Sequence, residues 1–222
     1  MASLLILGKV AFAGVGAVYL ARQCRKPSSR VGRVLARGMN ASHGRLTRWG
    51  LSHVEVGPRF TVLDVGCGGG QTIDTLATVA TDGKVFGIDY SADSVAVARE
   101  KNRSWIERAR VDIRHGSVSR LPFPDQTFDL VTAVETHYYW PDLAGDVREV
   151  LRVLKPGGAF LIIAESYRGR RNDWLYRPAM ALLRASYLSA DEHRNLLASA
   201  GYHDVDVFEE RSYGWICALG RR

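Results

Sequence analysis

The sequence predicts an α/β protein whose core is a doubly wound, mostly parallel sheet of seven strands with helices on both faces. Two observations support this fold class. From residue 61 onward, short β-branched runs alternate with helical stretches, which is the pattern of a parallel sheet with right-handed crossovers. A glycine-rich loop also stands between the first strand and the first helix, where sheets of this kind bind their ligands.

The elements are expected in a regular order along the chain. The predicted helices span residues 71–80, 92–102, 143–153 and 190–200, and the predicted strands span residues 61–65, 84–88, 111–115, 128–134, 159–164, 203–208 and 213–219. Only about four residues separate the last two strands, too few for a crossover connection. The last strand must therefore run antiparallel to its neighbour.

Composition fits a globular protein and narrows its class. The 222 residues are 46% hydrophobic and 24% charged, which excludes a wholly disordered, collagen-like or coiled-coil chain and allows one domain or at most two. The three cysteines lie far apart, so we expect neither a disulfide framework nor a CxxC pair. The six histidines lack metal-ligand spacing, so we expect no metal site.

The N-terminal quarter differs from the rest in charge and hydropathy. The net charge is +7, but the first 59 residues hold ten basic residues and one acid, so they carry +9 and the remainder carries −2. An apolar run from Leu4 to Leu20, interrupted only by Lys9, would be about 26 Å long as a helix, slightly less than the ~30 Å hydrocarbon core. The basic cluster at residues 22–26 would keep the body of the protein in the cytoplasm.

Three interpretations of this apolar run stay open: a membrane anchor or interfacial helix, a helix that docks on the body or frays, and a cleaved signal peptide. We expect residues 1–29 to form the apolar helix and its linker, and residues 30–222 to form the main domain. Within that domain, we expect two short helices over residues 30–52 as one wall of the site and an inserted helical cap over residues 166–188.

The loop Asp64-Val65-Gly66-Cys67-Gly68-Gly69-Gly70 is the most informative segment. Its glycines allow a sharp turn and a close approach of the backbone to a ligand. The dinucleotide fingerprint GxGxxG requires glycine at position 71, where this chain has Gln71. No P-loop Lys-Ser/Thr pair follows the loop. A nicotinamide-dependent oxidoreductase of the same sheet class is therefore the weaker alternative.

A second binding element ends the next predicted strand. Asp89 lies nineteen residues past Gly70, where a carboxylate can accept both hydroxyls of a ribose. Tyr90 offers an aromatic face or edge to a base. Capping of the following helix is the structural alternative for Asp89, but Ser91 and Asp93 can do this instead.

Four successive sequence motifs resemble those of a known enzyme family. DVGCGGG, GIDYS, HGSVSRLPFPDQTFD and VLRVLKPGGAFLIIAE resemble the motifs of class I S-adenosylmethionine-dependent methyltransferases, especially the branch that includes the ubiquinone/menaquinone C-methyltransferases (methyltransferase type 11 domain). The resemblance covers roughly residues 54–165. It implies a Rossmann-like fold with S-adenosyl-L-methionine lying over the tips of the first four strands, and S-adenosyl-L-homocysteine as product.

The resemblance also implies roles for single residues. Gly66, Gly68 and Gly70, with Cys67 between them, would make room for the methionine part of the cofactor, and Asp64 would lie beneath its amino group. Asp89 would bind the ribose. Related sequences often carry an acid near the adenine after the third strand. Here Ser117 would supply a weaker hydrogen bond, and Val118 would pack on the base or use its backbone N–H.

Cys67 also permits a nucleophile interpretation, which we disfavour because no histidine is near it in the sequence. The end of the fourth strand, Val134-Glu135-Thr136-His137-Tyr138-Tyr139-Trp140, should hold the acceptor side of the site. Glu135 or His137 would take a proton from the acceptor. In the structural alternative, Glu135 orders the cofactor's amino group, His137 makes a packing or polar contact, and the three aromatic residues pack under the cap.

We therefore expect an enzyme that methylates carbon or oxygen of a small lipophilic or aromatic molecule by in-line displacement. The Asn/Asp-Pro-Pro-Tyr/Phe motif of enzymes that methylate DNA amines or glutamine amides is absent at the fourth strand. Residues 167–171 are expected either as a solvated turn or, if they face the pocket, as a site for an acidic or enolate-bearing acceptor. A non-enzymatic cofactor-binding membrane adaptor and an RNA contact by the basic N-terminal helices are the remaining alternatives, and we expect nucleic acid not to be a partner.

Overall fold

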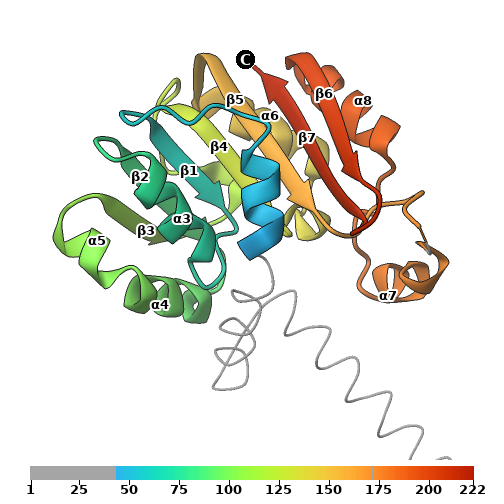
Figure 1. The fold of residues 1–222 in the computed structure, drawn as a ribbon, viewed down its shortest axis with the longest axis horizontal. Coiled ribbons are helices and arrows are strands. Elements are labelled where there is room, and N and C mark those ends of the chain that lie inside the picture. The colour runs from blue at the N-terminus through green and yellow to red at the C-terminus, as the bar shows by residue number, and fades with distance from the viewer. Residues whose placement is uncertain (1–43, 172) are drawn as a thin grey trace, which may run out of the picture.

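A computed structural model describes residues 44–171 and 173–222, which form three layers with the sheet in the middle (Figure 1). The seven-stranded sheet has the order β3-β2-β1-β4-β5-β7-β6. The first five strands pair in parallel, and β7 is antiparallel to both β5 and β6. The predicted fold class, including the antiparallel last strand, is confirmed.

The strands lie close to their predicted positions. They are β1 (Thr61–Val65), β2 (Lys84–Asp89), β3 (Val111–His115), β4 (Phe128–Val134), β5 (Leu154–Ala164), β6 (His203–Glu210) and β7 (Trp215–Arg221). The main difference is β5, which begins five residues before the predicted start at residue 159. Leu154 pairs with Phe128, and the register then shifts so that Ala159 pairs with Leu130. The Pro156-Gly157-Gly158 segment is therefore an irregularity within the strand, with Gly157 at φ +76°.

The helices also follow the prediction, with one addition. They are α3 (Gln71–Val79), α4 (Ala92–Lys101), α5 (Arg103–Glu107), α6 (Leu143–Val153), α7 (Arg177–Leu182) and α8 (Ala190–Ala200). Side-chain caps fix three starts: Ser91 accepts from Ser94 N–H, Asp142 from Gly145 N–H, and Ser189 forms a capping box with Glu192. The short helix α5 was not predicted.

Two apolar clusters join the layers. On one face of the sheet, Ile73 and Leu76 of α3 and Ala98 of α4 pack with Leu161 and Ile163 of β5. On the other, α6 and α8 pack against β1, β4 and β5 through Val147, Val150, Leu197, Leu63 and Phe160. Both faces of the central strands are thereby buried, which explains why those strands read as continuous hydrophobic runs.

The helix over residues 44–51 is the described part of the two helices expected in 30–52, and it lies on the α3 and α4 side of the sheet (Figure 1). Its Leu46 is buried, and Gly50 packs so closely on Ile163 that a Cβ there would lie 2.5 Å from the isoleucine Cδ1. The first of the two helices, the apolar run and the linker lie outside the described residues. Within residues 44–171 and 173–222, no helix combines the length and apolar character needed to cross a membrane.

The predicted cap contains the 3₁₀ turn η3 (Asp173–Leu175) and α7, and it stands at the edge of the molecule beyond the end of β5 (Figure 1). Its first residues are not a simple solvated turn. Tyr167 is buried in a cluster with Met180 and Ile216, and Arg170 lies over the Tyr176 ring at 4.3 Å while donating to the Glu165 carbonyl. The solvated-turn expectation is therefore wrong for these two residues, because the cap has its own small core.

Candidate functional site

The glycine-rich loop is held against the end of β2. Both Gly66 and Cys67 donate their N–H groups to the Ile88 carbonyl, at 2.8 and 3.1 Å. Gly68 donates its N–H to the Asp89 carboxylate at 2.9 Å. The loop after β1 and the carboxylate that ends β2, which are twenty-one residues apart in the sequence, therefore form one structural unit.

Three of the four glycines in this loop, Gly66, Gly68 and Gly70, are needed for different physical reasons. All three have positive φ. A Cβ at Gly66 would lie 2.0 Å from the Thr136 hydroxyl, and a Cβ at Gly70 would lie 2.5 Å from the Asn102 amide nitrogen. A Cβ at Gly68 would meet nothing within 4 Å. Internal packing thus accounts for Gly66 and Gly70, while Gly68 exposes its backbone to open space in which a ligand can lie.

Asp89 is almost fully buried and already accepts two backbone hydrogen bonds, from Gly68 N–H and from Ser91 N–H at 2.8 Å. Burial raises the pKa of its carboxyl, and the two N–H donors oppose that rise. A carboxylate has about four acceptor positions, so acceptor capacity remains for hydroxyl groups of a ligand. Ser91 caps α4 with its own side chain, so Asp89 is not needed as the helix cap.

Asp64 and Cys67 lie beneath the loop. The Asp64 carboxylate is buried and accepts a 2.7 Å hydrogen bond from the Thr132 hydroxyl on β4. Burial and, to a smaller degree, the charge of Asp89 raise its pKa to about 7, although the Thr132 bond lowers it. The Cys67 side chain is buried in the core beside Gly87, and burial raises the thiol pKa further above its usual range. A buried protonated thiol supports the packing interpretation rather than a nucleophile.

The expected base-binding residues lie at the ends of β2 and β3. Tyr90 is 38% exposed, and its carbonyl is 3.0 Å from His115 Nε2. The Ser117 hydroxyl accepts from Ser119 N–H at 3.2 Å and so caps the 3₁₀ turn η1 (Val118–Arg120). Val118 is buried in the core. The Ser117 hydroxyl therefore has a structural partner, and Val118 packs inward at the tip of β3.

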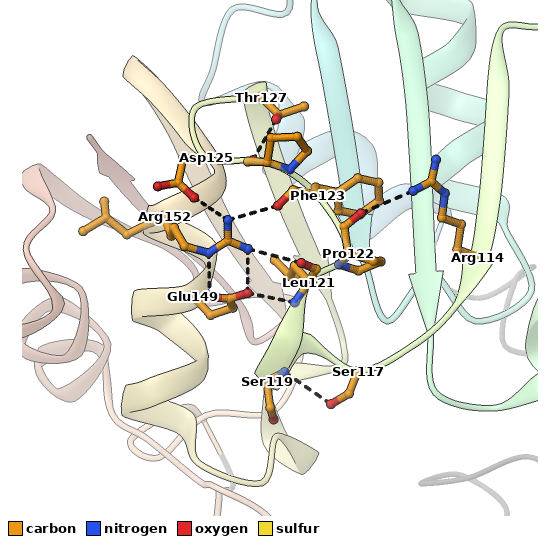
Figure 2. A network of polar contacts seen from close by, with 12 residues as sticks. Arg114, Ser117, Ser119, Leu121, Pro122, Phe123, Asp125, Thr127, Glu149 and Arg152 are labelled. Atoms are coloured by element: carbon orange, nitrogen blue, oxygen red, sulfur yellow. Dashed lines mark hydrogen bonds and ion pairs between the residues drawn. The ribbon is translucent and has the colours of Figure 1, made fainter.

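Arg152 on α6 holds the loop that follows these residues (Figure 2). Its guanidinium donates to the carbonyls of Leu121 at 3.2 Å and Phe123 at 3.0 Å, and it pairs with Asp125 at 2.6 Å. Glu149 accepts from the same guanidinium at 2.8 and 2.9 Å and from Leu121 N–H at 2.8 Å. The third and fourth sequence motifs are thus joined through one arginine.

Sequence reasoning missed this network, although one signal was present. Glu149 and Arg152 are three residues apart on one helix, a spacing that brings their side chains together. The hydrogen bonds from Arg152 lower the pKa of Glu149 and keep it charged. No pattern in the sequence indicates that the pair reaches the backbone of residues 121–123.

Glu135 follows β4 in the left-handed region at φ +58°. Its carboxylate accepts from the Glu165 N–H at the end of β5 and from the Tyr138 hydroxyl at 3.2 Å. Burial and the charge of Glu165 raise the pKa of Glu135 to about 8. Tyr138 also accepts from Ser166 N–H at 3.0 Å. Glu135 and Tyr138 therefore tie the ends of β4 and β5 to the start of the cap.

His137 is fully buried and forms a pair with His193 of α8, with 3.2 Å between their Nε2 atoms. His193 Nδ1 is 2.8 Å from the Ser189 carbonyl, which can only accept, so this nitrogen carries the hydrogen. The Nε2 of neutral His193 then accepts from His137 Nε2–H, which leaves His137 Nδ1 as an acceptor with no protein partner. Burial lowers the pKa of both rings and keeps them neutral. Sequence reasoning did not identify His193.

Two of the three aromatic residues after His137 are buried. Tyr138 packs under the cap with Tyr167 and Met180, as the packing interpretation expects. Trp140 instead stacks on Phe160 in the main core, with 6.2 Å between ring centroids. Among the residues that the structure describes, no group of three His, Cys, Asp or Glu side chains is arranged to hold a metal ion.

Comparison with known proteins identifies the fold and its family. Residues 63–162 match the family described as methyltransferase domain. A demethylmenaquinone methyltransferase of Bacillus mycoides is 37% identical over 114 residues, which are 51% of this chain and 48% of the relative. The chain thus spans about half the length of the curated relatives it matches.

Solved structures agree. A SAM-dependent methyltransferase from Aquifex aeolicus superimposes with a TM-score of 0.69 and 25% identity, covering 85% of this chain and 97% of the other. Haemonchus contortus phosphoethanolamine N-methyltransferase 2, in complex with phosphomonomethylethanolamine and S-adenosylhomocysteine, superimposes with a TM-score of 0.68 and 16% identity over 80% of this chain and 52% of the other. That likeness concerns the fold alone. The sequence match shows that residues 63–162 belong to the methyltransferase domain family, and the described fold is that of the class I S-adenosylmethionine-dependent methyltransferases.

Proposed function

We propose that this chain binds S-adenosylmethionine across the tips of β1 to β4 and directs its methyl group to a small lipophilic aromatic acceptor. The observation that carries the proposal is the unit made by Gly68 and Asp89. It combines an open space beside an uncovered backbone with a buried carboxylate that has acceptor capacity left. These are the features that the nucleoside and methionine parts of the cofactor require.

The residues of this site fit that cofactor. Asp89 would accept the ribose hydroxyls, Gly68 would leave room for the methionine chain, and Tyr90 would lie along the adenine. Asp64 and Cys67 lie beneath the loop and support it. Gly66 and Gly70 fix its two ends, while Ser117 and Val118 shape the turn at the base. The bound cofactor supplies an activated methyl group on a sulfonium.

The protein's task in such a reaction is alignment, exclusion of water and control of one proton. Glu135, with a pKa raised to about 8, is held at the end of β4 and faces the start of the cap. It would order the cofactor's ammonium group. The Nδ1 of His137 is an acceptor with no protein partner, so it is the atom that would take a proton from the methyl acceptor.

The proposed acceptor class is supported by the name of one relative. The Bacillus mycoides relative is a demethylmenaquinone methyltransferase, so a demethylmenaquinone-like aromatic is the acceptor that we propose first. The nicotinamide alternative has no support beyond the sheet class, because Gln71 occupies the position of the third fingerprint glycine.

The test is transfer of a labelled methyl group from S-adenosylmethionine to the lipid-soluble and water-soluble fractions of a cell extract, with demethylmenaquinone as a defined acceptor. We expect label in the lipid-soluble fraction, and loss of it with Asp89→Ala. Label only in the water-soluble fraction would contradict the acceptor class. No label in any fraction, with S-adenosylhomocysteine binding intact, would contradict methyl transfer itself.

A further inference from the structure

The outer surface of the cap is apolar and basic. Every exposed residue between positions 174 and 184 is either apolar or arginine. Three large apolar side chains project outward, with exposed fractions of 67% for Trp174, 56% for Leu175 and 60% for Leu182. We define the cap face as these three residues together with Pro178, Ala179, Ala181, Arg177 and Arg184.

The exposed side chains are not left over from poor packing. The inward side of the same segment is filled, because Met180 is buried and Tyr176 and Tyr187 pack against the cluster that contains it. Leu175 ends η3 and Leu182 ends the following helix α7, and both side chains are more than half exposed. Several large apolar side chains exposed on one short segment whose inward side is filled indicate a binding partner.

The charge of the segment indicates which partner. Residues 166–188 contain five arginines and one acid, Asp173. Asp173 is half-buried and already bound by Arg177 at 2.9 Å and by Gly169 N–H at 3.0 Å. The cap face therefore presents tryptophan and leucine among arginines with no exposed acid, which is the composition that lies in the interface of an anionic bilayer.

The cap face is connected to the acceptor side of the site. Ser166 N–H donates to the Tyr138 hydroxyl and Ser186 N–H donates to the Tyr138 carbonyl at 2.8 Å, so both ends of the cap are fastened to the turn that follows Glu135. If the cap face contacts lipid, the turn after Glu135 would lie close to the bilayer. A lipophilic acceptor would then reach the site without crossing water.

We propose that the cap face docks on the surface of an anionic lipid bilayer. The proposal rests on the proposed function in one respect, namely that the acceptor is lipophilic. The apolar N-terminal run also predicts lipid contact, so the test needs a signal that comes from the cap alone.

The experiment uses the full chain with Cys24→Ser, which leaves the buried Cys67 and Cys217. An environment-sensitive fluorophore is attached to Leu182→Cys, and a matched variant carries it at Val79→Cys, an exposed position at the end of α3. Each protein is mixed with phosphatidylcholine vesicles with and without phosphatidylglycerol. Binding of S-adenosylhomocysteine to both labelled proteins is measured by calorimetry in the absence of vesicles.

We expect a blue shift and quenching by brominated lipid at position 182 with the anionic vesicles, a smaller shift at high salt, and no shift at position 79. Vesicle binding without a change at position 182 would overturn the proposal, as would no binding at all. A label at 182 that is already blue-shifted without lipid would show that a protein surface covers the cap face, and would overturn it too. Loss of S-adenosylhomocysteine binding would instead count against the proposed function.

Discussion

Removal of the Arg152 side chain should destabilise the domain more than any surface arginine does. Arg152→Ala deletes two hydrogen bonds to backbone carbonyls, at 3.0 and 3.2 Å, and ion pairs with Glu149 and Asp125. Hydrogen bonds that involve a charged group contribute about 1.5–3 kcal/mol each. The Arg152 side chain is 32% exposed, which weakens its ion pairs through solvent screening.

We therefore expect a loss of about 2–4 kcal/mol in the free energy of unfolding, or about 5–15 °C in Tm. The assay is urea unfolding followed by circular dichroism. Arg148→Ala is the matched control, since Arg148 is exposed on the same helix. Arg152→Lys should fall between them, because an ammonium group cannot form the fork that reaches both carbonyls.

The same variant should also weaken S-adenosylhomocysteine binding, because the loop that Arg152 holds begins at Val118 beside the proposed base site. If Arg152→Ala were no less stable than Arg148→Ala, the network in Figure 2 would not hold the loop in solution. That result would refute the structural role assigned to it.

Three further predictions concern the site and the N-terminus. The pKa of Glu135 is raised to about 8 from 4.5, so the folded state binds its proton more tightly and stability falls as pH rises from about 4.5 to 8; Glu135→Gln should flatten this fall in urea unfolding at pH 5 and pH 8, and an unchanged slope would contradict the burial of that carboxylate. His137→Gln, which can keep the bond to His193, should lower methyl-transfer turnover by ~100- to 10,000-fold with little change in cofactor affinity if Nδ1 is the base, whereas a small effect would mean that the site works by alignment alone. Deletion of residues 1–26 should move the protein from the membrane fraction to the soluble fraction at high salt, which also weakens the proposed contact of the cap face, and should leave S-adenosylhomocysteine affinity intact; a full-length protein that is soluble without detergent would contradict the anchor.

Sequence periodicity predicted the sheet well because both faces of its central strands are buried. The strands 61–65, 111–115 and 128–134 and the helices 143–153 and 190–200 have the predicted bounds. The start of β5 could not be predicted, because Leu154 joins the strand through a pairing with Phe128 that depends on register rather than on local pattern. Helix α5 is one short turn and has no periodic signal.

The site could be predicted in part. Glycine spacing and a strand-end acid indicated Gly68 and Asp89, because these positions require particular residue types locally. The long-range contacts around the site were not predictable. The pairing of His137 with His193 joins residues 56 positions apart, and Arg152 reaches a loop about thirty positions away. Such contacts arise from the packing of α6 and α8 on the sheet, which no local pattern contains.

Calorimetric titration with S-adenosylhomocysteine tests most directly whether Gly68 and Asp89 form the cofactor site. The wild-type chain should bind, and Asp89→Ala should weaken binding by about 30- to 1000-fold, which corresponds to the ~2–4 kcal/mol net contribution of two hydrogen bonds to a charged acceptor. Asp82→Ala, the same substitution at an exposed aspartate, should bind as the wild type does. No binding by the wild-type chain, or equal dissociation constants for all three proteins, would contradict this assignment.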